Sequence, residues 1–442
     1  MKITETQIAH VNKQIEALIS ADSFYGKKLH EAGISKISSA EDFEQLPFSE
    51  KKDLREAYPL GLMTAPEEKI VRIHSSSGTT GLPIIIPYTA KDVDDWAIMF
   101  KRCYEMAGIT NLDRIQITPG YGLWTAGIGF QNGAEKLGAM VIPMGPGNTD
   151  KQLQMMMDMK SSVLCSTSSY ALLLAEEIEK RGIKDKIHLK KGVIGSERWG
   201  AKMRQRISSE LGIELYDIYG LTEIYGPGIG ISCQHDCGMH YWDDYVYIEI
   251  IDPETGAPVP DGEMGEIVIT TLVKEGAPLI RYRTHDLSRI IPGECPCGSH
   301  FPRLDVIMGR TDDMMKIKGV NVLLVEDNEL NMEIARFIIE NEGAKVTCAT
   351  NGKEAVDIYK NAPESFDIIL MDIMMPEMDG LQATQVIRSF DHDIPIVAMT
   401  ANAFMEDKIK AKKAGMNAHV SKPLDRNILI QVIAKLCGYK NV

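Results

Sequence analysis

Two different sequence patterns meet in this chain between Gly319 and Glu326. On the N-terminal side, short apolar runs alternate with amphipathic segments and then give way to a strand-rich region. On the C-terminal side a new and shorter alternation begins, in which apolar runs end in acidic, hydroxyl or lysine side chains. A chain of 442 residues is too long for one compact core and suits two or three domains. We therefore predict one domain over residues 1–320 and a second over residues 321–442.

The N-terminal part is predicted to be a mixed α/β domain. Apolar residues have helical spacing from Thr4 to Leu60, which is consistent with a helical cap. From Ile70 to about Leu215, apolar runs such as Arg114–Ile117 alternate with amphipathic segments, and this alternation indicates a mainly parallel sheet. Strand patterns then dominate, and we expect a small β subdomain over about residues 230–308.

The overall charge and the apolar pattern argue against two classes of partner. The formal net charge of -14 disfavours nonspecific nucleic-acid binding, because a protein that neutralises phosphates needs a basic face. No apolar run approaches the ~20 residues of a membrane-spanning helix, and the first residues lack the apolar core of a signal peptide. We therefore expect a cytoplasmic protein with no nucleic-acid or membrane partner. A homodimer is one oligomeric state that the sequence allows.

The most informative run in the N-terminal part is rich in hydroxyl groups and glycine, His74–Pro83. Its centre consists of Ser77, Gly78, Thr79 and Thr80. Such residues let backbone N–H and side-chain O–H groups approach phosphate oxygens without obstruction by Cβ atoms. The lysine of the common Gly-Lys-Ser phosphate loop is missing, which excludes that loop. Taken alone, the run is better explained as a flexible Ser/Gly turn.

Three further motifs follow in order: Asp217–Glu223, Tyr282–Asp286 and Gly309–Asp313. Together the four motifs resemble those of the acyl-adenylate-forming superfamily of ligases. Within it the chain is most similar to the phenylacetate-CoA ligases, over about residues 10–322. The runs that carry this similarity are Tyr121–Gly127, Gly195–Trp199, Gly226–Gly228 and Lys318–Val322. The resemblance implies that ATP and an aromatic carboxylic acid form an acyl-adenylate, which coenzyme A then converts to a thioester.

The same resemblance implies the phosphate and metal contacts of this reaction. Thr79 and Thr80, with neighbouring backbone, would hold the β- and γ-phosphates of ATP. Glu223, with Thr222 beside it, would bind Mg²⁺ and help to neutralise charge as the carboxylate attacks the α-phosphorus.

The resemblance also implies contacts to the nucleoside and to the acid. Tyr219 would stack on adenine, whose polar edge would lie near Ser196, Glu197 and Asp217. Asp286 would accept hydrogen bonds from the ribose hydroxyls, with Arg310 as a donor nearby. Tyr121 and Trp124 would wall an apolar slot for the aryl group. The alternatives are that Asp286 caps a turn and that Tyr219 and Trp124 are ordinary core aromatics.

The cysteines suggest a metal site. Eight cysteines are too few for a disulfide scaffold in so long a chain, but four lie in two short clusters. Two thiolates one residue apart beside Pro and Gly form a knuckle, and a distant Cys/His pair could complete a tetrahedral zinc site. Similarity to relatives of the phenylacetate-CoA ligases favours Cys233, His235, Cys295 and Cys297 as the zinc ligands. Cys237 is a reserve ligand, His240 is a weaker one, and free thiols are the alternative.

In the C-terminal part, four short apolar runs each end in a functional side chain. The first precedes Glu326 and Asp327, the second ends at Asp372, and the others end in Thr400 and Lys422. Residues at the carboxyl ends of neighbouring strands meet in one crevice of a doubly wound sheet, so these side chains should converge. Crowded carboxylates need a divalent cation, which would also orient a phosphoryl donor for in-line attack by Asp372.

This part resembles the receiver domain of two-component response regulators over nearly its full length. The runs that carry this resemblance are Val325–Asn328, Met371–Gly380, Met399–Asn402 and Ser421–Pro423. The resemblance implies a flavodoxin-like fold with Asp372 as the phosphoacceptor, and a histidine kinase or phosphotransfer protein as its partner. The implied Mg²⁺ ligands are Glu326, Asp327, Asp372 and the Met374 carbonyl. Thr400 and Lys422 would contact the new phosphate, and His419 stands where such receivers usually have Tyr or Phe.

The junction of the two patterns bears on activity. In the ligase superfamily, the lysine that promotes adenylation lies on a C-terminal domain that follows a hinge acid, here Asp312. The receiver pattern begins just past that hinge, and Lys422 has a receiver-like setting. We therefore interpret the chain as a chimera, engineered or natural, with impaired ligase turnover, and its status as an enzyme stays open. The alternative is a phosphorelay signalling protein whose ligase-like part only binds a nucleotide or another ligand.

Overall fold

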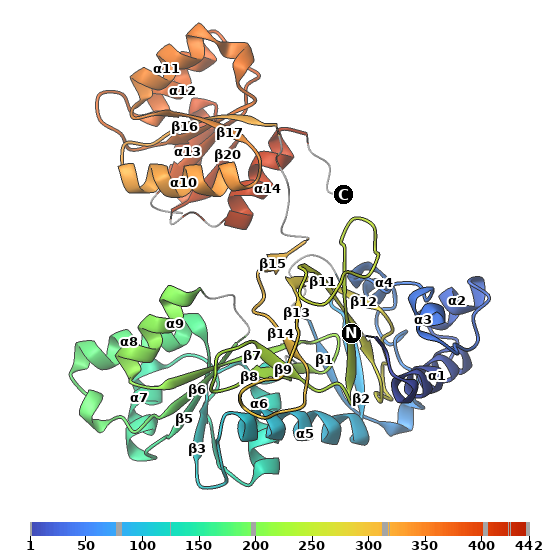
Figure 1. The fold of residues 1–442 in the computed structure, drawn as a ribbon. Coiled ribbons are helices and arrows are strands. Elements are labelled where there is room, and N and C mark those ends of the chain that lie inside the picture. The colour runs from blue at the N-terminus through green and yellow to red at the C-terminus, as the bar shows by residue number, and fades with distance from the viewer. Residues whose placement is uncertain are drawn as a thin grey trace. The chain divides into compact units, whose positions relative to one another are not determined.

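The structure is a computed structural model that describes residues 2–76, 82–123, 125–195, 200–311, 317, 319–400, 405–422, 424 and 426–438 (Figure 1). The chain divides into two compact units, Met1–Thr311 and Asp312–Val442. Each unit has its own sheets and its own apolar core. Among the described residues, no helix is long and apolar enough to cross a membrane.

The first unit opens with four helices, α1 (Glu5–Ser20), α2 (Phe24–Glu31), α3 (Ala40–Glu44) and α4 (Lys51–Glu56). Helix α1 begins at a capping box, in which the Thr4 hydroxyl accepts a hydrogen bond from the Gln7 N–H. Its apolar face, including Val11 and Ile15, packs in one core with Tyr247 from a later strand. These helices lie within the range that the apolar spacing predicts to be helical.

A nine-stranded sheet forms the body of the first unit, in the order β13-β14-β9-β8-β7-β6-β5-β3-β4. Its parallel strands are β3 (Arg114–Ile117), β4 (Met140–Pro143), β5 (Val163–Thr167), β6 (Lys191–Gly195) and β7 (Glu214–Leu221). Antiparallel strands extend it: β8 (Gly226–Ser232), β9 (Met239–Tyr241), β13 (Ile290–Ile291) and β14 (Arg303–Leu304).

Helices cover both faces of this sheet (Figure 1). They are α5 (Ala90–Met106), α6 (Ala126–Leu137), α7 (Thr149–Asp158), α8 (Ser168–Arg181) and α9 (Ala201–Leu211). Alternate residues of a strand point to opposite faces, so Cys165 and Val193 pack with residues of α5 and α6. Leu164 and Ile194 join the separate core of α7, α8 and α9. Strands buried on both faces explain the continuous apolar runs in the sequence.

Two smaller sheets complete the first unit. Strands β1 (Ile70–Ser75) and β2 (Ile85–Thr89) form an antiparallel pair. A four-stranded antiparallel sheet has the order β10-β11-β12-β15, with β10 (Val246–Ile251), β11 (Gly265–Thr271), β12 (Tyr282–Ser288) and β15 (Gly309–Arg310). The strands of residues 230–308 therefore divide between this sheet and the antiparallel edge of the nine-stranded sheet.

The second unit is a five-stranded parallel sheet of order β17-β16-β18-β19-β20. The strands are β16 (Asn321–Val325), β17 (Lys345–Ala349), β18 (Ile368–Asp372), β19 (Ile396–Thr400) and β20 (Ala418–Ser421). The helices are α10 (Glu329–Asn341), α11 (Gly352–Asn361), α12 (Gly380–Arg388), α13 (Met405–Ala414) and α14 (Arg426–Leu436). Val322 and Leu324 pack on one face of the sheet, and Leu323 and Val325 pack on the other. This arrangement confirms the predicted doubly wound, flavodoxin-like fold.

The residues just before β16 belong to the core of the second unit. Ile317 is 0% exposed and Val320 is 2% exposed, and both pack with Val322. The Val320 carbonyl accepts a hydrogen bond of 2.8 Å from the Lys345 N–H, and the Gly319 N–H donates to the Gly343 carbonyl at 3.1 Å. Part of the ligase-like run Lys318–Val322 therefore packs and forms hydrogen bonds within the second unit.

Candidate functional sites

Several predicted site residues lie outside the described residues. They are Ser77, Gly78, Thr79 and Thr80 of the phosphate run, Trp124 of the aryl slot, Ser196 and Glu197 near adenine, and the hinge acid Asp312. Their predicted roles remain predictions. The other predicted residues are described, and they fall into three clusters.

The first cluster joins strands β7, β12 and β15. The Tyr219 hydroxyl donates a hydrogen bond to Asp286 Oδ2 at 2.8 Å, and Arg310 Nη1 contacts Asp286 Oδ1 at 3.0 Å. Antiparallel pairing sets Asp286 directly opposite Arg310. Tyr219 and Asp286 are both buried, and burial raises the pKa of the Tyr219 hydroxyl well above its usual value, with Asp286 adding to the effect. The three residues that the resemblance assigned to adenine stacking and ribose binding are thus in mutual contact.

Glu223 and Thr222 follow strand β7 directly. Glu223 is buried, and its Oε1 atom lies 3.7 Å from the Nζ atom of Lys51 on helix α4. The Thr222 hydroxyl contacts the Thr125 hydroxyl at 3.1 Å. Lys51 is 50 residues or more from every predicted ligase motif except the phosphate run, so no sequence pattern pointed to it. The contact brings the helical cap to the carboxylate that was predicted to bind Mg²⁺.

A second lysine near Glu223 is fully buried. Lys274 is 0% exposed, its ammonium donates to the Ile224 carbonyl, and it lies over the rings of Tyr88 and Tyr225 at 4.5 and 4.7 Å from their centroids. Burial lowers its pKa to about 7, although the charges of Asp92 and Glu223 oppose the shift. A lone lysine after an apolar run gives no sequence signal that it will be buried near Glu223.

The pKa of Lys274 makes stability depend on pH. Between the folded value of about 7 and the ordinary value of 10.5, the unfolded chain binds a proton that the folded chain does not, so raising the pH favours folding. We expect the wild type to gain stability relative to Lys274→Met from pH 7 to pH 10, by on the order of 4 kcal/mol. Denaturant unfolding of both proteins across this range would measure the gain, and parallel profiles would contradict it.

The aryl-slot residue Tyr121 is half-buried, and its hydroxyl has no hydrogen-bond partner among the described residues. Burial raises the pKa of this hydroxyl. Beside it, the Leu123 carbonyl accepts from the Ser75 N–H at 2.9 Å and contacts His74 Nδ1 at 3.2 Å. The end of β1 and the Tyr121 run are therefore adjacent, as a site that brings phosphate and acid together requires.

The second cluster contains the predicted cysteines, but with a different histidine. Donor atoms of Cys233, His240, Cys295 and Cys297 all lie within 4.8 Å of one another. His235 is exposed, and its Nε2 atom contacts the neighbouring Gln234 side chain. The prediction that His235 is the histidine ligand is therefore wrong, because His240 and not His235 lies beside the sulfurs. Strand β9 pairs with β8, and this pairing sets His240 opposite Ile231 and next to the cysteine cluster.

The His240 ring is oriented as a metal ligand would be. Its Nδ1 atom lies 2.8 Å from the Phe301 carbonyl, which fixes the proton on Nδ1 and leaves Nε2 as the acceptor. That Nε2 atom is 3.3 Å from the Cys297 sulfur, and Cys295 lies 3.6 Å from Cys233. The reserve residue Cys237 is also close, at 3.1 Å from the Cys295 sulfur.

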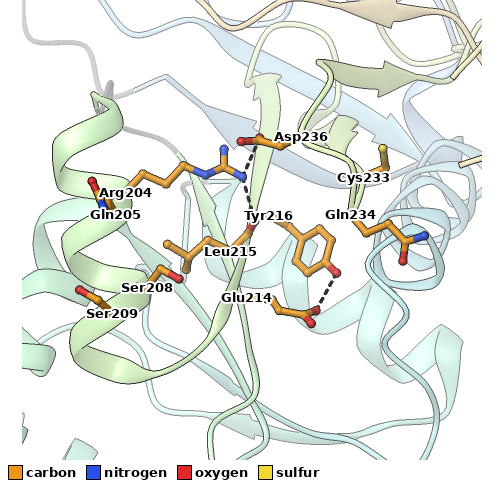
Figure 2. A pocket seen from close by; sticks show the side chains of 10 residues that line it. All are labelled: Arg204, Gln205, Ser208, Ser209, Glu214, Leu215, Tyr216, Cys233, Gln234 and Asp236. Carbon is orange, nitrogen blue, oxygen red and sulfur yellow. Dashed lines mark hydrogen bonds and ion pairs between the residues drawn. The ribbon is translucent and has the colours of Figure 1, made fainter. Parts of the chain in front are cut away.

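A cavity of about 600 Å³ lies beside this cluster, between helix α9 and the loop that carries Cys233 (Figure 2). Arg204 crosses it, donating to the Leu215 carbonyl at 3.0 Å and pairing with Asp236 at 2.9 Å. The cluster is also tied to β7, because the Ser232 hydroxyl accepts a hydrogen bond of 2.8 Å from the Asp217 N–H. Asp217, predicted near adenine, thus contacts the residue just before Cys233.

The third cluster lies at the carboxyl edge of the receiver sheet. Carboxylate oxygens of Glu326, Asp327 and Asp372 lie within 4.8 Å of one another. Glu326 is 1% exposed and Asp372 is 5% exposed, whereas Asp327 is exposed. The Met374 N–H donates to Asp372 Oδ1 at 3.3 Å. Crowded carboxylates of this kind match the oxygen ligands that Mg²⁺ prefers.

Lys422 bridges two of these acids, with its Nζ atom 2.6 Å from both Glu326 Oε2 and Asp372 Oδ2. Burial alone would lower the pKa of Lys422, but the contacts of its ammonium with Asp372 and Glu326 outweigh burial, and the net effect is a raised pKa. Thr400 ends β19, the strand next to β18, and is buried. His419 lies on β20, paired with Ala398 of β19. The acids and the lysine therefore converge as predicted, and Thr400 ends the strand next to them.

Comparison with known proteins agrees with this division. Residues 5–272 match the family AMP-binding enzyme, and residues 322–434 match the response regulator receiver domain. Phenylacetate-coenzyme A ligase from Pseudomonas putida is 43% identical over 303 residues, which cover 68% of this chain and 68% of that ligase. Probable histidine kinase 4 from Oryza sativa subsp. japonica is 35% identical over 142 residues, covering 27% of this chain and 14% of the kinase.

A solved structure shares the fold of the first unit. The open conformation of 2-hydroxyisobutyryl-CoA ligase, in complex with 2-HIB-AMP and CoA, has a TM-score of 0.65 and 29% identity, covering 69% of this chain and 74% of that chain. The chain therefore belongs to the AMP-binding enzyme family, with phenylacetate-coenzyme A ligases among its relatives, and its C-terminal part is a response regulator receiver domain.

Proposed function

We propose that the first unit binds ATP and an aromatic carboxylic acid to form an acyl-adenylate, and that the receiver accepts a phosphoryl group on Asp372. The contact set of Tyr219, Asp286 and Arg310 carries the first half of this proposal. Asp286 Oδ2 accepts from the Tyr219 hydroxyl and Oδ1 from Arg310, and a carboxylate oxygen can accept more than one hydrogen bond, so ribose hydroxyls can be added. Arg310 orients the carboxylate for that role.

The surroundings of Glu223 support Mg²⁺-assisted attack on the α-phosphorus. A buried carboxylate requires a compensating cation, and the Lys51 ammonium lies 3.7 Å from Glu223. Glu223 would hold Mg²⁺, which would offset charge on the phosphates as the acid carboxylate attacks. The half-buried Tyr121 ring would wall the slot for the aryl group, and coenzyme A would be the final acyl acceptor, as the names of the relatives suggest.

Ground-state binding and turnover should differ in this chain. Lys422 lies within the receiver match, residues 322–434, and its ammonium contacts Glu326 and Asp372. Its role would therefore be in phosphotransfer. It does not substitute for the adenylation lysine of the superfamily. We therefore infer that nucleotide binding is retained and adenylation is slow. The second candidate function is signalling, in which the ligase-like unit acts only as a nucleotide- or ligand-binding module, and the complete receiver site favours it.

Replacing Asp286 tests nucleotide binding directly. We expect Asp286→Asn to weaken ATP binding by about tenfold to a hundredfold, because hydrogen bonds to a charged group are lost. Isothermal titration with Mg-ATP would measure the change. Asp305→Asn is the matched control, since Asp305 pairs with Arg289 at 2.8 Å outside the cluster. Equal affinities for the wild type and Asp286→Asn, both folded, would refute the ribose assignment.

The cysteine cluster is proposed to hold a structural zinc ion. Three thiols and an imidazole nitrogen are the donor set that zinc prefers, and the Phe301 carbonyl orients the imidazole. The ligands come from the β8–β9 hairpin and from the loop between β13 and β14. A metal there would crosslink the antiparallel edge of the large sheet and have no part in the chemistry.

The two nearby histidines provide a sharp test of this zinc site. We expect His240→Ala to lose bound zinc and to lower the melting temperature, whereas His235→Ala keeps both, since only His240 faces the sulfurs. Metal content by mass spectrometry and the visible spectrum of the cobalt-substituted protein would report the outcome. Zinc loss in His235→Ala alone would reverse the ligand assignment, and no zinc in the wild type would refute the site.

A further inference from the structure

A second cavity, of about 410 Å³, lies at the opposite edge of the large sheet from Glu223. It is formed where three strands begin: the loops before β3, β5 and β6 supply its lining. The lining residues with positive charge are Arg114, Lys160, Lys190 and Lys191. Four cations around one small cavity are unusual in a chain whose net charge is -14.

Backbone carbonyls hold two of these cations in place. Lys191 Nζ donates to the carbonyls of Ala107 and Gly108 at 2.6 and 2.7 Å, and Arg114 Nη1 donates to the Met159 carbonyl at 2.8 Å. Carbonyl partners orient a cation without cancelling its charge. An anion that binds these groups would therefore lose little side-chain entropy in ordering them.

The cations of this cavity outnumber its carboxylates. Among the residues that the structure describes, none of the four cations forms an ion pair. One carboxylate, Asp113, lies in the described lining, where its oxygens accept hydrogen bonds from the Thr110 N–H at 2.8 Å and from the Ser162 hydroxyl at 2.8 Å, so it offsets the charge of only one of the four cations. Like charges that share a cavity repel one another, so an incoming anion relieves that repulsion as well as forming contacts.

We propose that this cavity binds a small phosphate-bearing polyanion. The charge density suits a ligand with two or more negative charges in a small volume, and a concave site selects a small molecule over a flat protein surface. The site is separate from the adenylation site, because β3 and β6 begin at this cavity and run toward the other edge of the sheet. It does not depend on the activity proposed above.

Inorganic pyrophosphate is the probe for this site, titrated calorimetrically into the full chain with AMP at saturation so that the nucleoside and α-phosphate positions of the nucleotide site are filled. We expect saturable binding that weakens as salt is added. In Lys160→Gln/Lys190→Gln, which removes the two exposed cations, binding should weaken by about tenfold or more. Inorganic tripolyphosphate and coenzyme A, tested in parallel, distinguish an inorganic ligand from a nucleotide that carries the same groups.

The matched control is Lys180→Gln/Lys186→Gln, which removes the same charge from exposed lysines outside the cavity. It should bind pyrophosphate as the wild type does. Equal weakening in the two double variants would mean that only the overall charge matters and would overturn the proposal. Absence of saturable binding to the wild type under AMP saturation would overturn it as well, and so would binding that Lys160→Gln/Lys190→Gln leaves unchanged, which would place pyrophosphate in the β- and γ-phosphate positions of the nucleotide site.

Discussion

Asp372→Asn is expected to abolish phosphorylation of the chain by acetyl phosphate in the presence of Mg²⁺, while the fold is retained. Asp372 ends strand β18 within the receiver match, lies beside Glu326 and Asp327, and contacts Lys422, which also contacts Glu326. An amide cannot attack phosphorus, so the loss should be complete. Intact-mass spectrometry would show one phosphoryl group on the wild type and none on the variant.

Asp393→Asn is the matched control, because Asp393 is exposed and lies in the same unit outside the site. It should be labelled as the wild type is. Phosphorylation without Mg²⁺ should be slow, since the crowded acids need a cation before a phosphoryl donor can approach. A folded wild type that gains no mass with Mg²⁺ would rule out the receiver half of the proposed function. Labelling of Asp372→Asn would show that another residue accepts the phosphoryl group.

The second large effect concerns the ligase half. We expect acyl-adenylate formation, measured as ATP–pyrophosphate exchange with a panel of aryl acids, to be slower by about 10²–10³-fold than in an intact ligase, which is the loss typical of one missing charge-stabilising group. ATP should still bind, because the contacts of Asp286, Arg310 and Tyr219 are ground-state contacts. Together these results would show retained binding with reduced turnover.

Any residual exchange should vanish in Glu223→Gln, which separates slow catalysis by this chain from a contaminating ligase. An aryl-CoA turnover in the ordinary enzyme range, on the order of 1–10³ per second, would overturn the inference of impaired adenylation. Undetectable exchange together with full ATP affinity would instead favour the signalling alternative, in which the first unit only binds ligands.

The receiver site was predictable because its rule is topological. Once alternating runs predict parallel strands, the residues that end those strands must share one edge, and Glu326, Asp372 and Lys422 do so. The flavodoxin-like fold followed from the same pattern. In the first unit the resemblance likewise predicted Tyr219, Asp286 and Arg310 as one site, although residues 67 positions apart (Tyr219 and Asp286) and 24 positions apart (Asp286 and Arg310) carry no periodic signal of their contact.

The histidine of the cysteine cluster and the lysines near Glu223 could not be predicted, because their contacts do not follow from spacing along the sequence. His235 is nearer to Cys233 in sequence than His240 is, but the hairpin between β8 and β9 turns His240 toward the sulfurs. Lys51 contacts Glu223 from a helix, and Lys274 interacts electrostatically with Glu223 from a loop, and neither lysine belongs to a motif. Single lysines are common on surfaces, so only packing could identify these two as part of the site.

The burial of Ile317 and Val320 has a practical consequence for separating the two units. Each buries an apolar side chain in the receiver core, a contribution of about 1.5–3 kcal/mol per residue. A receiver excised at the first residue of β16 would lose both, together with the hydrogen bonds of Gly319 and Val320. Recombination that exchanges this domain between proteins should therefore carry the preceding residues with it, starting directly after Thr311, where the compact first unit ends.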